Sequence, residues 1–170
     1  MELNYNTLVD ILNNEKIDFE ITEHKSLFTV KESEEINNKI IGVHTKNLFL
    51  KNKKNIFFLF SCKNDTSVNL KQLSKNSIFK NLSFANESYL KEFTRMTPGS
   101  VNPFGLLFDK KEIVSLYLDI KLLDHEIVNF HPMINTATIS IKVSSFLGFM
   151  KRKNKLVNLI NFDTNQVIKE

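Results

Sequence analysis

The sequence predicts an α/β fold in which residues 1–170 form a single-domain mixed β-sheet with flanking helices. Stretches with the helical spacing of apolar residues interleave with short strand-like stretches, which is typical of a mixed sheet covered by helices. A hydrophobic share of 42% with 15 Phe supports one self-sufficient core, because a chain of this length buries about 70% of its unfolded surface. No repeat, low-complexity tract or linker divides the chain.

The first half of the chain alternates helix and strand signals. Leu8, Ile11 and Leu12 share one helical face, and Asn6 or Thr7 is expected to cap that helix. Two apolar runs flank a lysine-rich turn without alternating, which predicts a hairpin of central strands covered on both faces. In order, we expect a helix ending near Asn14, a strand at 19–24, a short helix at 30–36 and hairpin strands at 47–50 and 56–62.

The second half continues the alternation. Asn69 and Asn86 are suited to cap two short helices, and Ser144 a third. Apolar runs on both sides of Asp109-Lys110-Lys111 predict a second hairpin. In order, we expect helices at 70–75 and 87–93 with an extended piece at 82–84 between them, hairpin strands at 106–108 and 113–118, a helical turn at 122–126, strands at 128–130 and 136–141, a helix after Ser144 and a closing strand at 156–162.

The composition excludes several classes of protein. The longest apolar runs, such as 56–60, are far shorter than the roughly 20 residues that span a bilayer, and the N-terminus has no signal-peptide pattern. Cys62 is the only cysteine, so neither an internal disulfide nor a cysteine zinc cage is possible. We therefore expect a cytoplasmic protein with no membrane partner. The net charge of +4 is compatible with a polyanionic partner, but a lysine-rich composition explains it equally well.

The glycines and prolines cluster in one loop. Of four Gly and three Pro in the chain, four lie between Pro98 and Gly105. Pro98-Gly99 predicts a turn, and Pro103 forces the residue before it to be extended. The backbone N–H groups of residues 99–102 could then converge on an anion or a developing oxyanion. A plain connection between a helix and a strand explains the cluster as well.

Two ionisable residues stand out along the predicted strands. Lys46 has the same strand parity as Leu48 and Leu50, so it either places a cation against a phosphate or ester oxygen or extends to solvent from a strand end. His131, before Pro132, either orients a substrate or is a hydrogen-bonded structural residue, and His24 and His44 are similar cases. No zinc-protease, nucleophile-elbow or nucleotide-loop motif is present, and Ser100 is not expected to be a nucleophile.

Basic residues gather at three places on the chain. They are candidates for binding phosphate groups, although runs of basic residues usually lie on the solvent-exposed surface. They are Lys51, Lys53 and Lys54 in the first hairpin turn, Lys80, and Lys151, Arg152, Lys153 and Lys155 after the penultimate helix.

In their order and joint presence, these residues resemble the trans-acting prolyl-tRNA editing family, the superfamily of YbaK and the prolyl-tRNA synthetase insertion domain. Within it, the chain is most similar to free-standing alanyl-tRNA(Pro) deacylases, from Leu8 to about Leu159. One departure is the stretch 94–97, where the family often has glycine-rich sequence. The matching pieces are Glu23-His24, Phe28-Thr29-Val30, Gly42 to Leu50 with Lys46-Asn47-Leu48-Phe49-Leu50, Asn69-Leu70-Lys71, Leu82-Ser83-Phe84-Ala85, Pro98 to Leu106, and His131-Pro132 with Asn135-Thr136-Ala137-Thr138.

The resemblance implies hydrolysis of the ester between a mischarged amino acid and the terminal adenosine, with no metal, cofactor or covalent intermediate. It implies catalytic roles for Lys46, His131 and the Gly-x-x-x-Pro loop of Gly99 and Pro103, whose main chain holds the scissile carbonyl and the ribose. We expect the side chains of Ser100 and Asn102 to be replaceable. The expected substrate-binding residues are Phe28, Thr29, Val30, Ser100, Val101, Asn102, Met133 and Asn135, and the expected tRNA-binding residues are Lys51, Lys53, Lys80, Lys151 and Arg152.

The implied partner is the acceptor end of tRNA(Pro), with transient contact to prolyl-tRNA synthetase or an elongation factor. A monomer is expected, with a dimer as the alternative. Three other functions stay open at this point: a cysteinyl-tRNA(Pro) deacylase, a module that binds aminoacyl-tRNA or a synthetase without hydrolysis, and an unrelated small-molecule-binding protein.

Overall fold

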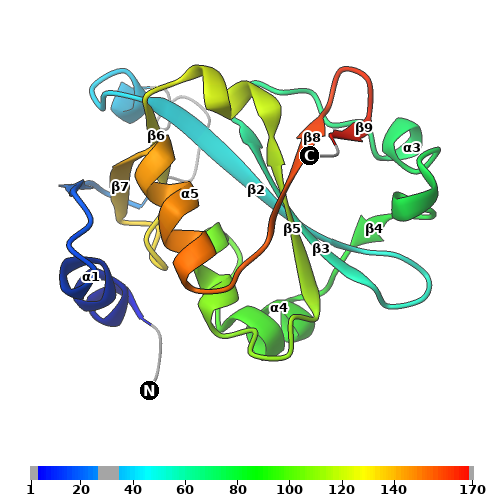
Figure 1. The fold of residues 1–170 in the computed structure, drawn as a ribbon, viewed down its shortest axis with the longest axis horizontal. Helices are drawn as coiled ribbons and strands as arrows, with labels where there is room; N and C mark the ends of the chain where they lie inside the picture. Colours follow the sequence, from blue (N-terminus) through cyan, green and yellow to red (C-terminus); the bar gives the residue numbers. More distant parts are fainter. Residues whose placement is uncertain (1–3, 27–34, 169–170) are drawn as a thin grey trace.

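The computed structural model of the protein describes residues 4–26 and 35–168. They form a nine-stranded mixed sheet with the order β1-β7-β6-β2-β3-β5-β8-β9, and β4 pairs with β2 away from this path. Figure 1 shows α5 lying across one face of the sheet, with α1 beside it. The predicted mixed sheet with flanking helices is therefore confirmed.

Most predicted elements lie where the sequence placed them, and β9 was not predicted. The strands are β1 (Phe19–Glu23), β2 (Val43–Lys51), β3 (Phe57–Lys63), β4 (Ser83–Phe84), β5 (Val114–Asp119), β6 (Ile127–Phe130), β7 (Ala137–Lys142), β8 (Val157–Asn161) and β9 (Gln166–Ile168). The α-helices are α1 (Tyr5–Asn14), α3 (Leu70–Leu73), α4 (Glu87–Thr94) and α5 (Val143–Arg152), and the 3-10 helices are η1 (Ser77–Phe79), η2 (Pro103–Leu107) and η3 (Ile120–Asp124).

The two faces of the sheet bury two separate hydrophobic clusters. Along β3, Phe57 and Leu59 belong to the large cluster, whereas Phe58 and Phe60 belong to the small one. Residues of α1, α4 and α5 cover the large cluster, and residues of α3 and η1 cover the small one. β3 is thus buried on both faces, as its unbroken apolar run predicted.

The first predicted hairpin is confirmed and the second is wrong. β2 and β3 pair antiparallel across the lysine-rich turn. Residues 103–107 form η2 and not a strand, because Asn102 caps this short helix and Pro103 occupies its first turn. β5 then pairs parallel with β3 and with β8. Parallel neighbours are joined by long crossovers, so no local turn signal reveals them.

Helix caps were predicted with mixed success. Asn69 and Asn86 accept hydrogen bonds from the first turns of α3 and α4, as expected. The cap of α1 is Asn4, whose side chain accepts from the Thr7 N–H at 3.0 Å, and neither Asn6 nor Thr7. α5 begins after Lys142 without a side-chain cap, so the assignment of Ser144 as its cap was wrong. The helix expected at 30–36 falls mainly on residues outside the described ranges.

The part of the sheet formed by β1, β7, β6 and the start of β2 is apolar on one face only. Val128, Ile139 and Ile141 belong to the large cluster. Strand alternation places Asn129 and Thr138 on the opposite face, where both are buried. Polar side chains buried in a sheet need partners, so this polar face is a candidate site.

Within the described ranges, no helix is long and apolar enough to cross a membrane.

Close packing at η2 makes Gly105 sensitive to substitution. A Cβ at Gly105 would lie 2.6 Å from the Sδ of buried Met96. We predict that Gly105→Ala lowers the free energy of unfolding by about 1–3 kcal/mol, as overpacked core substitutions do, measured by urea denaturation. The matched control is Gly148→Ala in α5, where the new Cβ meets only the flexible end of Arg152 at 3.4 Å. Equal stabilities of the two variants would contradict this packing.

Candidate active site

The loop between α4 and η2 contains the predicted turn. The Ser100 N–H donates to the Thr97 carbonyl at 3.2 Å, and Gly99 has φ of +86°. Proline followed by a residue with positive φ is typical of a type II turn. A Cβ at Gly99 would meet nothing within 4 Å, so the requirement for glycine here is conformational and not steric.

Hydrogen bonds within the loop occupy two of the four backbone N–H groups, those of residues 99–102, that were predicted to face a ligand. The Ser100 N–H is used in the turn, and the Asn102 N–H donates to Met96 Sδ at 3.2 Å. No described residue accepts from the N–H of Gly99 or of Val101. Two donors on alternate residues therefore remain available to a ligand, of the kind that stabilise a developing oxyanion.

The side chains of Ser100 and Asn102 are used by the loop itself. Asn102 is fully buried; its Nδ2 donates to the Ser100 carbonyl at 2.7 Å, and its Oδ1 accepts from the Phe104 N–H at 2.9 Å. The Ser100 hydroxyl donates to the Thr97 carbonyl at 3.0 Å. The Asn102 amide therefore has a structural role, because it closes the loop and caps η2, and the expectation that Asn102 is replaceable stays a prediction. Pro103 is buried in the first turn of that helix.

His131 is held in one orientation by the strand that pairs with its own. Its Nδ1 donates to the Ala137 carbonyl at 3.1 Å, which leaves Nε2 as the acceptor in the neutral ring. Burial lowers the pKa of His131 below its ordinary value, and the nearby His24, with ring centroids 5.9 Å apart, lowers it further. His131 is therefore a neutral hydrogen-bonding group at neutral pH.

A small polar cavity of about 70 Å³ lies beside His131. Asn129 Nδ2 donates to the Ile41 carbonyl at 3.2 Å and to His44 Nε2 at 3.1 Å, and Asn129 Oδ1 is buried without a partner within the described ranges. Burial also lowers the pKa of His44. Sequence reasoning missed Asn129, although alternation from Asn129 to His131 could have indicated a shared face. The lining residues are Asn37, His44, Thr45, Asn64, Asn129, Phe130, His131 and Thr138.

Lys46 lies on an open edge of β2. The parallel pairing of β2 with β6 ends at His44 and Asn129, and continuing this register places Lys46 level with His131. Towards the other end of β2, the Ala85 N–H donates to the Phe49 carbonyl. Between these points, no described strand pairs with this edge of β2.

The Lys46 ammonium has no ion pair or hydrogen bond with the described residues. By alternation it shares a face with Leu48 and Leu50, which contact the small cluster. Within the described ranges no hydrogen bond joins Lys46 to the loop of Gly99, which is anchored in the large cluster through Met96 and Phe104.

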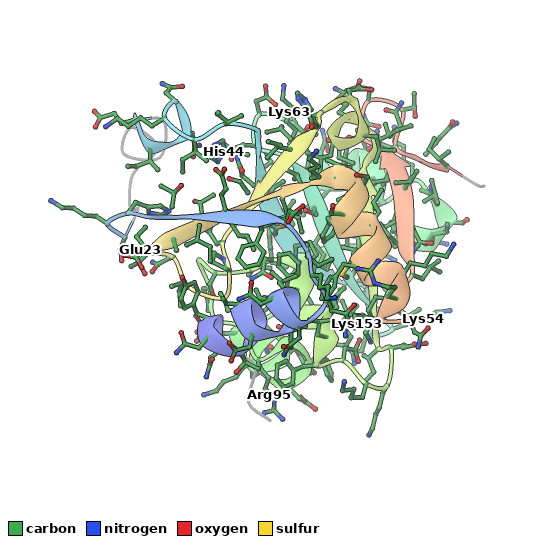
Figure 2. All side chains as sticks on the ribbon, turned by 60° about the vertical axis from the view of Figure 1, so that its left-hand side comes forward. Glu23, His44, Lys54, Lys63, Arg95 and Lys153 are labelled. Carbon is green, nitrogen blue, oxygen red and sulfur yellow. The ribbon has the colours of Figure 1, made fainter. Side chains whose placement is uncertain are left out.

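The predicted pocket residues connect the loop to the histidines. Met133 has φ of +66°, its N–H donates to the His131 carbonyl at 3.0 Å, and its Sδ accepts from Asn102 Nδ2 at 3.4 Å. Asn135 Oδ1 accepts from the Ser26 hydroxyl at 3.4 Å. The loop thus contacts the segment after His131 through Asn102, at its end. Figure 2 shows Arg95, just before the loop, on the opposite side of the view from His44. The remaining predicted pocket residues lie outside the described ranges: Phe28, Thr29 and Val30.

The predicted tRNA-binding residues fall into separate places. Lys53 and Lys80, together with Lys54, line one cavity of about 460 Å³. Lys51 donates to Asn55 Oδ1 at 2.8 Å and lies over the Tyr89 ring. On α5, Lys151 lines a different cavity, and Arg152 pairs with Glu15 at 3.1 Å. Arg152 is therefore partly neutralised, whereas Lys53 and Lys80 have no carboxylate partner within the described ranges.

These features define a class of protein: a mixed-sheet α/β domain whose candidate site consists of main-chain N–H donors, a neutral histidine and a lysine with no partner among the described residues. Within the described ranges, no cluster of His, Cys, Asp or Glu could hold a metal ion.

Comparisons with known proteins give the family. Residues 24–149 match the model of the aminoacyl-tRNA editing domain. The chain is 36% identical over 151 residues to the Bos taurus prolyl-tRNA synthetase associated domain-containing protein 1, covering 86% of the chain and 88% of the relative. It is 33% identical over 141 residues to the prolyl-tRNA editing protein ProX of Acetoanaerobium sticklandii, covering 82% and 86%. The chain belongs to the aminoacyl-tRNA editing family, as its motifs indicated.

Solved structures agree on the fold. A crystal structure described as a proposed trans-editing enzyme for prolyl-tRNA synthetase aligns with a TM-score of 0.67 at 18% identity, covering 92% of this chain and 96% of the other. At this identity the likeness concerns the fold.

The half-buried histidines His44 and His131 predict a pH dependence of stability. A group whose pKa is lowered by folding binds fewer protons in the folded state, so its stabilising contribution is present above the ordinary pKa of about 6.5 and is lost as the pH falls below it. We predict a lower free energy of unfolding at pH 5.5 than at pH 7.5, measured by urea denaturation. His131→Gln should weaken this dependence. An unaltered dependence in His131→Gln would refute the assignment.

Proposed function

We propose that this protein is a trans-editing deacylase that hydrolyses the ester of alanyl-tRNA(Pro). The observation that carries the proposal is the pair of N–H groups at Gly99 and Val101, which have no acceptor within the described ranges and are presented by a turn fixed on both sides. Membership of the editing family and the likeness to a prolyl-tRNA editing protein support the same substrate class.

The reaction requires little from side chains. An aminoacyl ester is already activated, so water adds to the carbonyl carbon and the charge that develops on its oxygen is stabilised by the Gly99 and Val101 N–H groups. The bond from the carbonyl carbon to the ribose oxygen then breaks. The neighbouring ribose hydroxyl relays the proton of the water to that leaving oxygen, which yields free alanine and tRNA with an intact 3′ end.

Lys46 and His131 serve to hold the substrate. The Lys46 ammonium, without a partner among the described residues, is suited to a phosphate or ester oxygen of the acceptor end as it passes the open edge of β2. Neutral His131 offers Nε2 as a hydrogen-bond acceptor beside Met133 and Asn135, which belong to the proposed amino-acid pocket with Phe28 and Val30. A small pocket rejects proline by size more readily than it rejects alanine.

The direct test is deacylation of three substrates by the purified protein. We predict loss of the amino acid from alanyl-tRNA(Pro) and retention on prolyl-tRNA(Pro), measured with labelled amino acids. Cysteinyl-tRNA(Pro) assayed in parallel tests whether the pocket admits a somewhat larger side chain. Faster loss from the cysteinyl form would reassign the substrate, and no loss from any form would leave a binding module in place of an enzyme.

A second test addresses the turn. Gly99→Ala puts a side chain where φ is +86° and shifts the peptide that carries the donors. Because loss of one oxyanion donor costs about 10²–10³-fold in turnover, we predict a fall of at least tenfold in kcat for alanyl-tRNA(Pro). Gly148→Ala is the control, since its helical position tolerates a side chain. A folded Gly99→Ala protein with normal kcat would overturn the role of the turn.

A further inference from the structure

An exposed aromatic side chain lies at the end of the open edge of β2. Phe84 of β4 is 63% exposed, and it is the only aromatic residue among the exposed large hydrophobic side chains of the described ranges. β4 pairs with the last residues of β2, with Phe84 opposite Leu50, and Figure 1 shows β4 beside the end of β2 that leads into the β2–β3 turn.

Strand alternation places Phe84 on the same face as Lys46. Residues opposite each other on neighbouring strands point to the same side of a sheet, so Phe84 shares the face of Leu50 and, four residues earlier in β2, of Lys46. At about 3.3 Å per residue, Lys46 and the Phe84 position are about 13 Å apart along the strand.

The basic cavity continues this face beyond Phe84. Besides Lys53, Lys54 and Lys80, the cavity is lined by Phe58 and Tyr117, whose side chains belong to the small cluster, on the face of Leu50. A cation without a partner among the described residues therefore lies on one side of Phe84, and a group of lysines without carboxylate partners lies on the other. An apolar ring between cations complements a single-stranded nucleic acid, whose bases stack on aromatic faces while its phosphates bind lysines.

We propose that Phe84 is a positioning residue that stacks an unpaired nucleobase of the acceptor 3′ end, between Lys46 and the basic cavity. This inference rests on the proposed function, because it takes the acceptor end to be the strand that is bound. At about 3.4 Å per stacked nucleotide, the distance of about 13 Å corresponds to about four stacked nucleotides, and to fewer where the strand is extended. The base on Phe84 therefore precedes the terminal adenosine, and the duplex part of the acceptor stem lies over the basic cavity.

The test compares two substrates of different length. Alanyl-adenosine carries the ester and the terminal nucleoside only, whereas an alanyl-minihelix of tRNA(Pro) carries the whole acceptor end. We predict that Phe84→Ala raises KM for the minihelix about five- to 150-fold, the effect of losing one base stack, and leaves kcat and the hydrolysis of alanyl-adenosine unchanged. Phe84→Trp should retain the wild-type KM, and Phe84→Leu, apolar but without a ring, should behave like Phe84→Ala.

Matched controls separate stacking from structure and from the proposed function. Leu156→Ala removes another exposed apolar side chain, 78% exposed and distant in sequence, and should change neither KM nor stability. An unchanged KM for the minihelix in Phe84→Ala, an equal loss on both substrates, or an equal KM for Phe84→Leu and Phe84→Trp would overturn the stacking proposal while the deacylase assignment stands. Absence of hydrolysis of either substrate by the wild-type protein would instead overturn the proposed function, and the stacking proposal with it.

Discussion

The buried amide of Asn102 is the constraint on which the candidate site depends. It bonds to the Ser100 carbonyl, to the Phe104 N–H and to Met133 Sδ, so one side chain closes the loop, starts η2 and connects both to the segment after β6. An amide removed from water is costly unless its hydrogen-bonding groups are satisfied, which fixes the loop in one shape. Because Ser100 and Asn102 use their own N–H groups within that shape, those of Gly99 and Val101 remain for a ligand.

The two faces of the sheet carry different parts of the candidate site. The large cluster anchors the loop through Met96 and Phe104, which makes the donors rigid. The opposite face carries neutral His131, the Asn129 Oδ1 that has no partner within the described ranges and, further along, Lys46 and Phe84. The open edge of β2 lies between these regions, where the parallel ladder with β6 stops. A substrate long enough to use both regions suits this arrangement, and the end of a tRNA is such a substrate.

Local patterns in the sequence predicted much of the fold and less of the site. The unbroken apolar run of β3 predicts a strand buried on both faces, and the Pro98-Gly99 pair predicts a turn. Each pattern lies within a few residues of the chain, and the structure confirms both. The run from Leu106 to Phe108 was misread because an apolar run of that length fits a strand or a buried 3-10 helix equally, and the cap at Asn102 decides between them. Asn129 and His44 meet only through the parallel pairing of β6 with β2, which leaves no local signal.

In the proposed mechanism, the Gly99 and Val101 N–H groups hold the carbonyl of the substrate. Amide proton chemical shifts of the 15N-labelled protein test it most directly, titrated with alanine joined to adenosine through a 3′-amide that cannot be hydrolysed. We expect the amide protons of Gly99 and Val101 to move downfield as they gain an acceptor, and those of Ser100 and Asn102, already bonded within the loop, to change little. Saturable binding that leaves the Gly99 and Val101 amides unshifted, or that shifts mainly Ser100 and Asn102, would contradict it.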